Sequence, residues 1–166
     1  MTPAARVNAK AIYRHLRKEV ELPENLIVAM MANIGVETGY TYDFTTKQKG
    51  RSDPAYGLFQ FDPRGKGLYS LYHEYLDHTN ADDSMESQLN MMVDILLRVW
   101  VRGVQFVGSG NVTKVMRAAN MGADEATRAF SSHILRPGVP HMDRRIAEIE
   151  KVKKVIEEVK EENDRP

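Results

Sequence analysis

The segment "IVAMMANIGVETGYTYDF", residues 27–44, decides how the rest of the sequence is interpreted. Its first half carries apolar side chains at helical spacing, and Pro23 suits the first turn of the helix that they predict. Positions 27, 30, 34 and 37 step by three, four and three, so the buried face of this helix continues to Glu37. The sequence thus predicts a carboxylate at the edge of an apolar core, at the C-terminal end of a helix.

A glutamate in that position has an expected chemistry. Apolar surroundings and the negative end of the helix dipole both raise the pKa of a carboxyl group. A carboxylic acid that keeps its proton near neutral pH serves as a general acid, which makes Glu37 a catalytic candidate. The alternative is that the apolar stripe ends at Ile34 and that Glu37 is simply solvated.

The remaining pattern is helical almost throughout and predicts an all-α fold. Helices are expected over 8–20, with Val20 on the buried face, and over 68–75. A long helix over 84–107 is apolar on more than one side and is expected at the centre, with Asp83 and Glu86 as its capping box. The expected N-caps of the next two helices are Asn111 and Asp124.

Residues 39–67, "GYTYDFTTKQKGRSDPAYGLFQFDPRGKG", interrupt the helical pattern. Their content of Gly, Pro and Asp predicts a long irregular stretch with a possible short hairpin. Loops of this length in a compact domain are usually functional or disordered, and the many aromatic side chains argue against disorder. Flat aromatic faces are also the usual platform for sugar rings.

The C-terminal residues 146–166 form a charged helix with a narrow apolar seam at Ile149, Val152, Ile156 and Val159. We therefore divide the chain into a domain over 1–145 and this extension. Two interpretations stay open for the extension. It packs on its own domain, or it is a docking or coiled-coil helix that joins a larger assembly.

Composition excludes several classes of protein. The 166 residues suggest one domain, and the absence of cysteine excludes disulfides and thiolate metal sites. The 23 basic and 23 acidic residues argue against a nucleic-acid partner. No apolar run predicts a signal peptide or membrane insertion. His73 and His78 are five residues apart and point away from each other on a helix, so no metal is expected, and no cofactor is implied.

"ANIGVETGYTYDF", followed by "AYGLFQFDP", resembles the phage tail lysozyme family, which is related to goose-type lysozymes and soluble lytic transglycosylases. "SQLNMMVDIL" and "DEATRAFSSHILRPGVPHMDRRIAEI" are similar to its central helix and closing block. The resemblance implies a lysozyme-like domain that cleaves bacterial peptidoglycan with Glu37 as the acid. It also implies substrate-binding residues. They are Gly57, Leu58 and Gln60, the neighbouring aromatics Tyr56 and Phe61, and Asn120 in "AANMG".

Two cleavage chemistries are compatible with one glutamic acid. Inverting hydrolysis needs a second carboxylate to activate water. Asp43 is the expected second acid, because Asp53 and Asp62 each precede a proline and suit turns. A lytic transglycosylase needs no second acid, because the sugar's own 6-hydroxyl attacks.

The resemblance also implies where the protein works. It is synthesised in the host cytoplasm, incorporated in the virion, expected in the tail, and acts locally on the host cell envelope. The C-terminal helix would contact other virion proteins. The rival hypotheses are a structural virion protein with little or no activity and a free endolysin.

Overall fold

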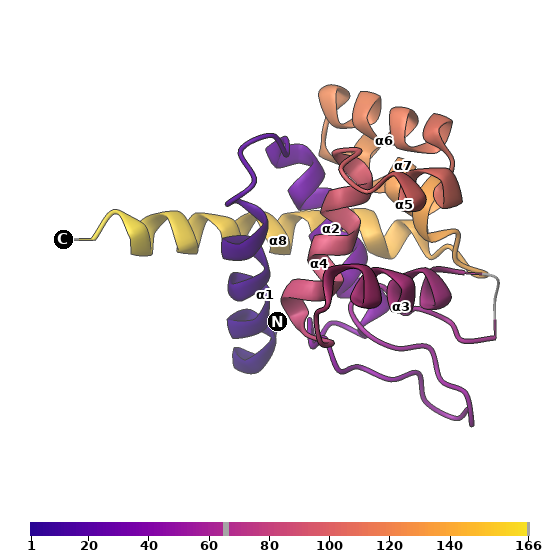
Figure 1. Ribbon diagram of the computed structural model, residues 1–166. Coiled ribbons are helices and arrows are strands. Elements are labelled where there is room, and N and C mark those ends of the chain that lie inside the picture. The colour runs from indigo at the N-terminus through magenta and orange to yellow at the C-terminus, as the bar shows by residue number, and fades with distance from the viewer. Residues whose placement is uncertain (65–66, 166) are drawn as a thin grey trace.

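The computed structural model describes residues 1–64 and 67–165. Within these residues the chain is 66% helical, with eight α-helices, one π-helical turn and no strand, which confirms the predicted all-α class (Figure 1). The elements are α1 (Pro3–Leu16), α2 (Glu24–Glu37), α3 (Leu68–Thr79), α4 (Met85–Leu96), α5 (Val101–Val107), α6 (Ser109–Met121), α7 (Ala123–Phe130), η1 (Ser131–Leu135) and α8 (Met142–Asn163).

Helix α2 lies at the centre of the molecule. Every residue from Leu26 to Gly35 is buried, and both α7 and α8 pack along it. A helix that is apolar all round belongs in a core, because it has no face suited to water. The sequence also predicted a central, buried place for the segment 84–107, and its first part, α4, is largely buried as well.

The segment 84–107 forms two helices, not one. The chain breaks after α4, where Arg98 takes a left-handed conformation (φ 60°) and the N–H groups of Val99 and Trp100 both donate to the Asp94 carbonyl. Helix α5 then folds back onto α4 at Gly103. A Cβ atom there would lie 2.6 Å from a side-chain carbon of Ile95, so only glycine permits this close approach.

The predicted helix ends also differ from the observed ones. Ser84, not Asp83, caps α4, because its hydroxyl accepts the Ser87 N–H at 3.0 Å. Asn111 lies inside α6, and Asp124 lies in the first turn of α7 after the N-cap Gly122. Helix α1 ends at Leu16, which leaves the predicted core residue Val20 93% exposed.

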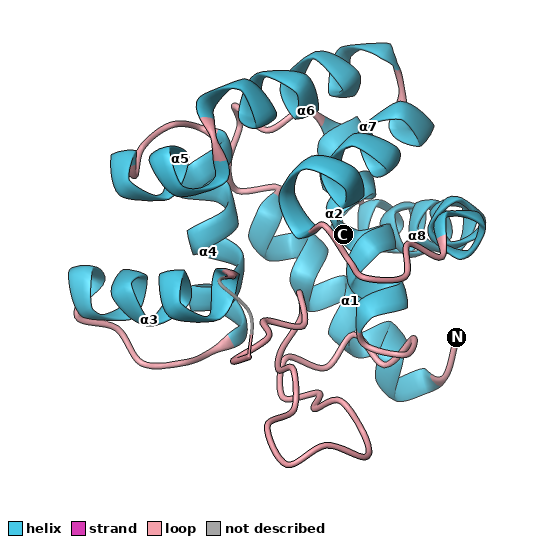
Figure 2. Ribbon diagram, turned by 90° about the vertical axis from the view of Figure 1, so that its right-hand side faces the viewer, coloured by secondary structure: helices cyan, strands magenta, loops and turns pink. Residues whose placement is uncertain are grey.

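The segment 38–64 projects from the helical body as an irregular loop (Figure 2). Two isolated bridges, Lys47 with Tyr56 and Tyr56 with Phe61, stand where the sequence allowed a short hairpin. The buried Gln88 of α4 anchors this loop. Its side-chain oxygen accepts the Leu58 N–H at 2.8 Å, and its amide donates to the Phe44 carbonyl at 3.1 Å.

Helix α8 crosses the whole molecule (Figure 1). Its predicted seam is buried against α1 and α2, so the charged helix packs on its own chain. On one side, Glu158 and Glu162 form ion pairs with Arg6, Lys10 and Arg14 of α1. Docking to a larger assembly stays a prediction, and it would have to use the outer faces of α8.

Candidate active site

Glu37 is the last residue of α2, and 14% of its side chain is exposed. Its Oε1 accepts a hydrogen bond of 2.8 Å from Nη2 of Arg145, whose own side chain is 2% exposed. The same guanidinium donates to Asn33 Oδ1 at 2.9 Å and to the Pro140 carbonyl at 2.6 Å. Since Arg145 lies in the first turns of α8, the carboxylate is held between the end of one buried helix and the start of another.

The environment of Glu37 has opposing effects on its protonation. Burial raises the pKa of Glu37 above its ordinary value, while the charge and hydrogen bond of Arg145 and the charge of His141 oppose the rise. Burial outweighs them, so the pKa is raised, in the direction that the sequence predicted. A carboxyl group with a raised pKa at a partly exposed position has the properties of a general acid.

A second carboxylate, that of Glu148, is also buried. Glu148 of α8 accepts a hydrogen bond of 2.5 Å from the hydroxyl of Tyr42, which is 1% exposed and has a left-handed backbone (φ 56°). Burial and the charge of Glu148 raise the pKa of Tyr42, so the phenol remains a donor. The Tyr42 N–H also donates to Thr38 Oγ1 at 2.9 Å. These bonds fix the turn that follows Glu37.

Gly35 leaves the room for this arrangement, and its replacement should disrupt it. In Gly35→Ala the new Cβ would lie 2.5 Å from the Tyr42 hydroxyl and 2.7 Å from Glu148 Oε2. We expect a loss of about 1–3 kcal/mol in the free energy of unfolding, measured by urea denaturation. The control is Gly110→Ala in α6, where a Cβ meets nothing within 4 Å, and which should gain about 0.5–1 kcal/mol. Equal effects at both positions would contradict this account.

A cavity of about 340 Å³, the first cavity, opens between the end of the 38–64 segment, the start of α3, the end of α5 and η1. Its polar wall is made by Gln60, Asp62, His133 and Arg136. Glu37 does not line it, but the turn over 136–141 runs from its wall to His141 and Arg145 beside the acid. The cavity and the acid therefore border the same turn.

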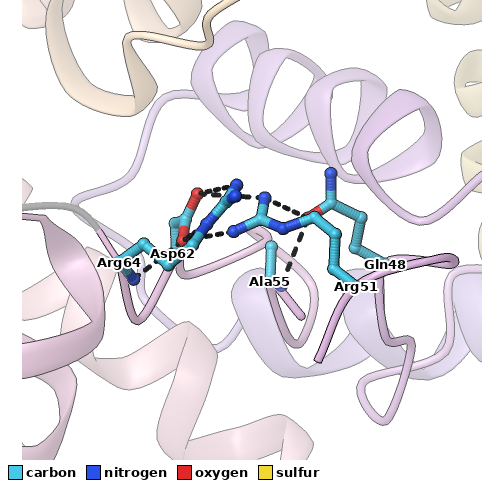
Figure 3. A network of polar contacts seen from close by, with 5 residues as sticks. All are labelled: Gln48, Arg51, Ala55, Asp62 and Arg64. Carbon is cyan, nitrogen blue, oxygen red and sulfur yellow. Dashed lines mark hydrogen bonds and ion pairs between the residues drawn. The ribbon is translucent and has the colours of Figure 1, made fainter. Parts of the chain in front are cut away.

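Asp62 is the carboxylate that the fold brings to this cavity. It pairs with Arg51 at 3.3 Å and with Arg64 at 3.5 Å, and Arg51 also binds Gln48 (Figure 3). Asp62 further accepts the Arg64 N–H at 2.9 Å, which is the turn role that its sequence position predicted. The carboxylate thus combines a turn with a place on the cavity wall.

Asp43, the expected second acid, lies in neither of the two cavities that we describe. Its Oδ1 accepts hydrogen bonds from the N–H and the hydroxyl of Thr45 at 2.8 and 2.7 Å. The reason for preferring Asp43, that turn chemistry explains it least, was therefore wrong, because it is a turn former too.

The predicted substrate-binding residues have different surroundings. Leu58 is fully buried and presents no surface to a ligand in this structure. Gly57 (φ 88°) makes the turn over Gln88, where any Cβ would clash. Gln60 lines the first cavity while its amide donates to the carbonyls of Thr46 and Gly57 at 3.0 and 2.8 Å.

The other three predicted substrate-binding residues also differ in their surroundings. Phe61 is 1% exposed and packs on Tyr72 with ring centres 5.0 Å apart, at the base of the first cavity. Tyr56 is half-buried and belongs to a second cavity. Asn120 is exposed at the end of α6 and lines neither of the two cavities that we describe, so its role stays a prediction.

Sequence reasoning missed Arg145, although a signal was present. Positions 145, 149, 152, 156 and 159 follow one face of α8, so Arg145 continues the apolar seam towards the N-terminus of the helix. It missed Asn33 because this residue lies inside an apolar run, and it missed Glu148 because this residue is one of many charged residues in α8.

Between 1–64 and 67–165, no group of three or more histidine, aspartate or glutamate side chains is arranged to hold a metal ion. In the same part of the chain, no helix combines the length and the apolar character that crossing a membrane requires.

Comparison with known proteins identifies the family. The family model described as phage tail lysozyme matches residues 7–156, a range that contains Glu37, Arg145 and all the residues that line the first cavity. Searches of curated proteins and of solved structures gave no match. The chain belongs to the phage tail lysozyme family and is a lysozyme-like protein that acts on the bacterial cell wall.

Proposed function

We propose that the protein cleaves the glycan strand of bacterial peptidoglycan, with Glu37 as the general acid. The observation that carries the proposal is the state of Glu37. It is a largely buried carboxyl group with a raised pKa, held by Arg145 at the end of the central helix. A pocketed glutamic acid of this kind protonates the glycosidic oxygen in lysozymes. Membership of the family supports the same substrate.

In the first step Glu37 transfers its proton to the oxygen between two sugars, and the bond from that oxygen to the anomeric carbon breaks. In a hydrolase a second carboxylate then removes a proton from the water that attacks the anomeric carbon. We assign this second role to Asp62 in preference to Asp43, since Asp62 lies on the wall of the first cavity.

A lytic transglycosylase reaction uses the same acid without Asp62. The 6-hydroxyl of the sugar attacks its own anomeric carbon and gives its proton to the Glu37 carboxylate, which forms a 1,6-anhydro ring. The buried site around Glu37 suits this route as well, because a carboxylate that has lost its proton in apolar surroundings is a stronger base.

Mass spectrometry of digested peptidoglycan distinguishes the two reactions. Reducing-end muropeptides would mark the hydrolase. Asp62→Asn should then lower the rate about 10²-fold or more, and Asp43→Asn should leave it within a few-fold. Anhydro ends that persist in Asp62→Asn would mark the transglycosylase and remove Asp62 from the mechanism. If the folded protein releases no product at all, the alternative of a structural virion protein holds.

We further propose that the enzyme is carried on the phage tail, as the family description suggests. The exposed charged face of α8 is the candidate contact with other virion proteins, because its apolar seam is already occupied. Detection of the protein in purified particles supports this location, whereas its presence only in the lysate favours a free endolysin.

A further inference from the structure

A second cavity of about 360 Å³ is lined in part by chain neighbours of residues that line the first. Asp62 and Leu68 line the first cavity, and their chain neighbours Pro63 and Tyr69 line the second. The second cavity is also bordered by Lys47, Asp53, Pro54, Tyr56, Tyr72, His73, Leu76 and Asp83. Asp62, the proposed second carboxylate, thus lies on the wall of the first cavity, and the next residue, Pro63, lies on the wall of the second.

Flat rings dominate the walls of the second cavity. The rings of Tyr69 and His73 lie 4.6 Å apart along one side of α3, and Tyr72, which is 2% exposed, closes the base. Pro54 and Pro63 add rigid apolar surface. Such walls suit a ligand with a flat face of C–H groups, as a pyranose ring has.

The polar atoms at the base are already oriented. The hydroxyl groups of Tyr56 and Tyr72 donate to the two carboxylate oxygens of Asp83 at 2.6 and 2.5 Å. Because these protons are engaged, the phenol oxygens have only acceptor capacity left for a ligand. At the mouth, the exposed Lys47 supplies donors and Asp53 supplies acceptors. Sugar hydroxyl groups both donate and accept, so they match this arrangement.

We propose that the second cavity binds a pyranose ring of the glycan strand, as a holding site separate from the cleavage site. The inference rests on the proposed function for the identity of the polymer. A strand held in both cavities stays attached after each cleavage, because two weak sites joined by one polymer raise the effective concentration at each. Glycans too short to span the two cavities should therefore be poorer substrates than long ones.

The test uses the full chain with Glu37→Gln, which binds without cleaving, and a β-1,4-linked N-acetylglucosamine tetramer, which carries no peptide. Residue-resolved NMR should show shifts of the backbone amides of Tyr69 to Leu76. Tyr69→Ala should weaken binding at these amides about tenfold, and Tyr69→Phe, which keeps the ring, should preserve it.

A second pair of variants, His73→Ala and His78→Ala, distinguishes loss of binding at the cavity from a general folding defect. Both histidines are exposed on α3, but only His73 lines the cavity, while His78 stacks on Trp100. Binding should weaken in His73→Ala and stay unchanged in His78→Ala. Equal binding by the two variants would overturn the inference.

Other outcomes separate the two proposals. Shifts at the second cavity only with peptide-bearing muropeptides, or only with a proline-rich peptide, overturn the sugar assignment. Cleavage by the wild type with no tetramer shifts along α3 overturns the holding site and leaves the proposed function intact. If the tetramer shifts the amides along α3 but the wild type cleaves nothing, the holding site is supported and the proposed enzymatic activity is contradicted.

Discussion

Glu37→Gln should lower the rate of glycan cleavage by about 10²–10⁴-fold, the usual contribution of a general acid. The amide is nearly the same size as the carboxyl group, but it has no acidic proton to give to the leaving oxygen. Its oxygen can still accept the hydrogen bond from Arg145, so the helix ends stay together. The measurement is the release of muropeptides from purified peptidoglycan, followed by liquid chromatography and mass spectrometry.

The control for this prediction is Glu150→Gln on α8, where the side chain is 78% exposed and pairs with Lys153 at 3.8 Å. It should cleave at the wild-type rate. Circular dichroism and thermal unfolding establish that both variants are folded. A folded Glu37→Gln protein with full activity would falsify the assignment of the acid.

Arg145→Met should cost about 3–5 kcal/mol in the free energy of unfolding, because it breaks a buried ion pair from one side. The change leaves Glu37, Asn33 and the Pro140 carbonyl without their common donor. The neighbouring Arg144 is exposed, so Arg144→Met changes the same type of side chain outside the core. Urea denaturation gives the free energy of unfolding of each variant. The two values should differ by nearly the whole loss that is expected for Arg145→Met.

The loss in Arg145→Met should also depend on pH. Removing the cation raises the pKa of Glu37 further, since Arg145 is the main group that opposes the effect of burial. A carboxyl group whose pKa is raised on folding stabilises the fold at low pH and loses this contribution as the pH rises through the raised value. The difference in free energy of unfolding between wild type and Arg145→Met should therefore increase from pH 5 to pH 8. A difference that decreases would contradict the raised pKa.

The double variant Arg145→Met with Glu37→Gln isolates the cause. If the penalty arises from an uncompensated buried carboxylate, the added glutamine should recover part of the lost stability at pH 8. Independent, additive losses would mean that the guanidinium acts mainly through Asn33 and Pro140.

The position of Glu37 at the edge of the core could be predicted from the sequence, because it follows from the helical period of the buried residues in α2. The stripe of α2 runs into Glu37, and the seam of α8 begins at Arg145. Glu37 and Arg145 each occupy a position that the helical period assigns to the core. Two buried stripes that end in opposite charges on packed helices are expected to pair, and the same pattern would have identified Arg145.

Other features depend on contacts that no local pattern contains. Gln88 is 44 residues from Phe44 and 30 from Leu58, so its role as the anchor of the loop is invisible in the sequence of either. The break after α4 depends on Arg98 in a left-handed conformation, which arginine does not favour by itself. Asp43 and Asp62 both form turns, and only the folded chain shows which carboxylate reaches a cavity.

The course of α8 has a consequence for how activity arises. Its first turns supply the partner of the acid, 108 residues from Glu37 along the chain, and its last turns bind α1 across 152 residues. Contacts between such distant residues carry an entropic cost, because the intervening chain must first be brought together. The Glu37–Arg145 pair therefore depends on the assembly of the whole domain, and under the proposed function a partly folded chain would be inactive even where α2 has already formed.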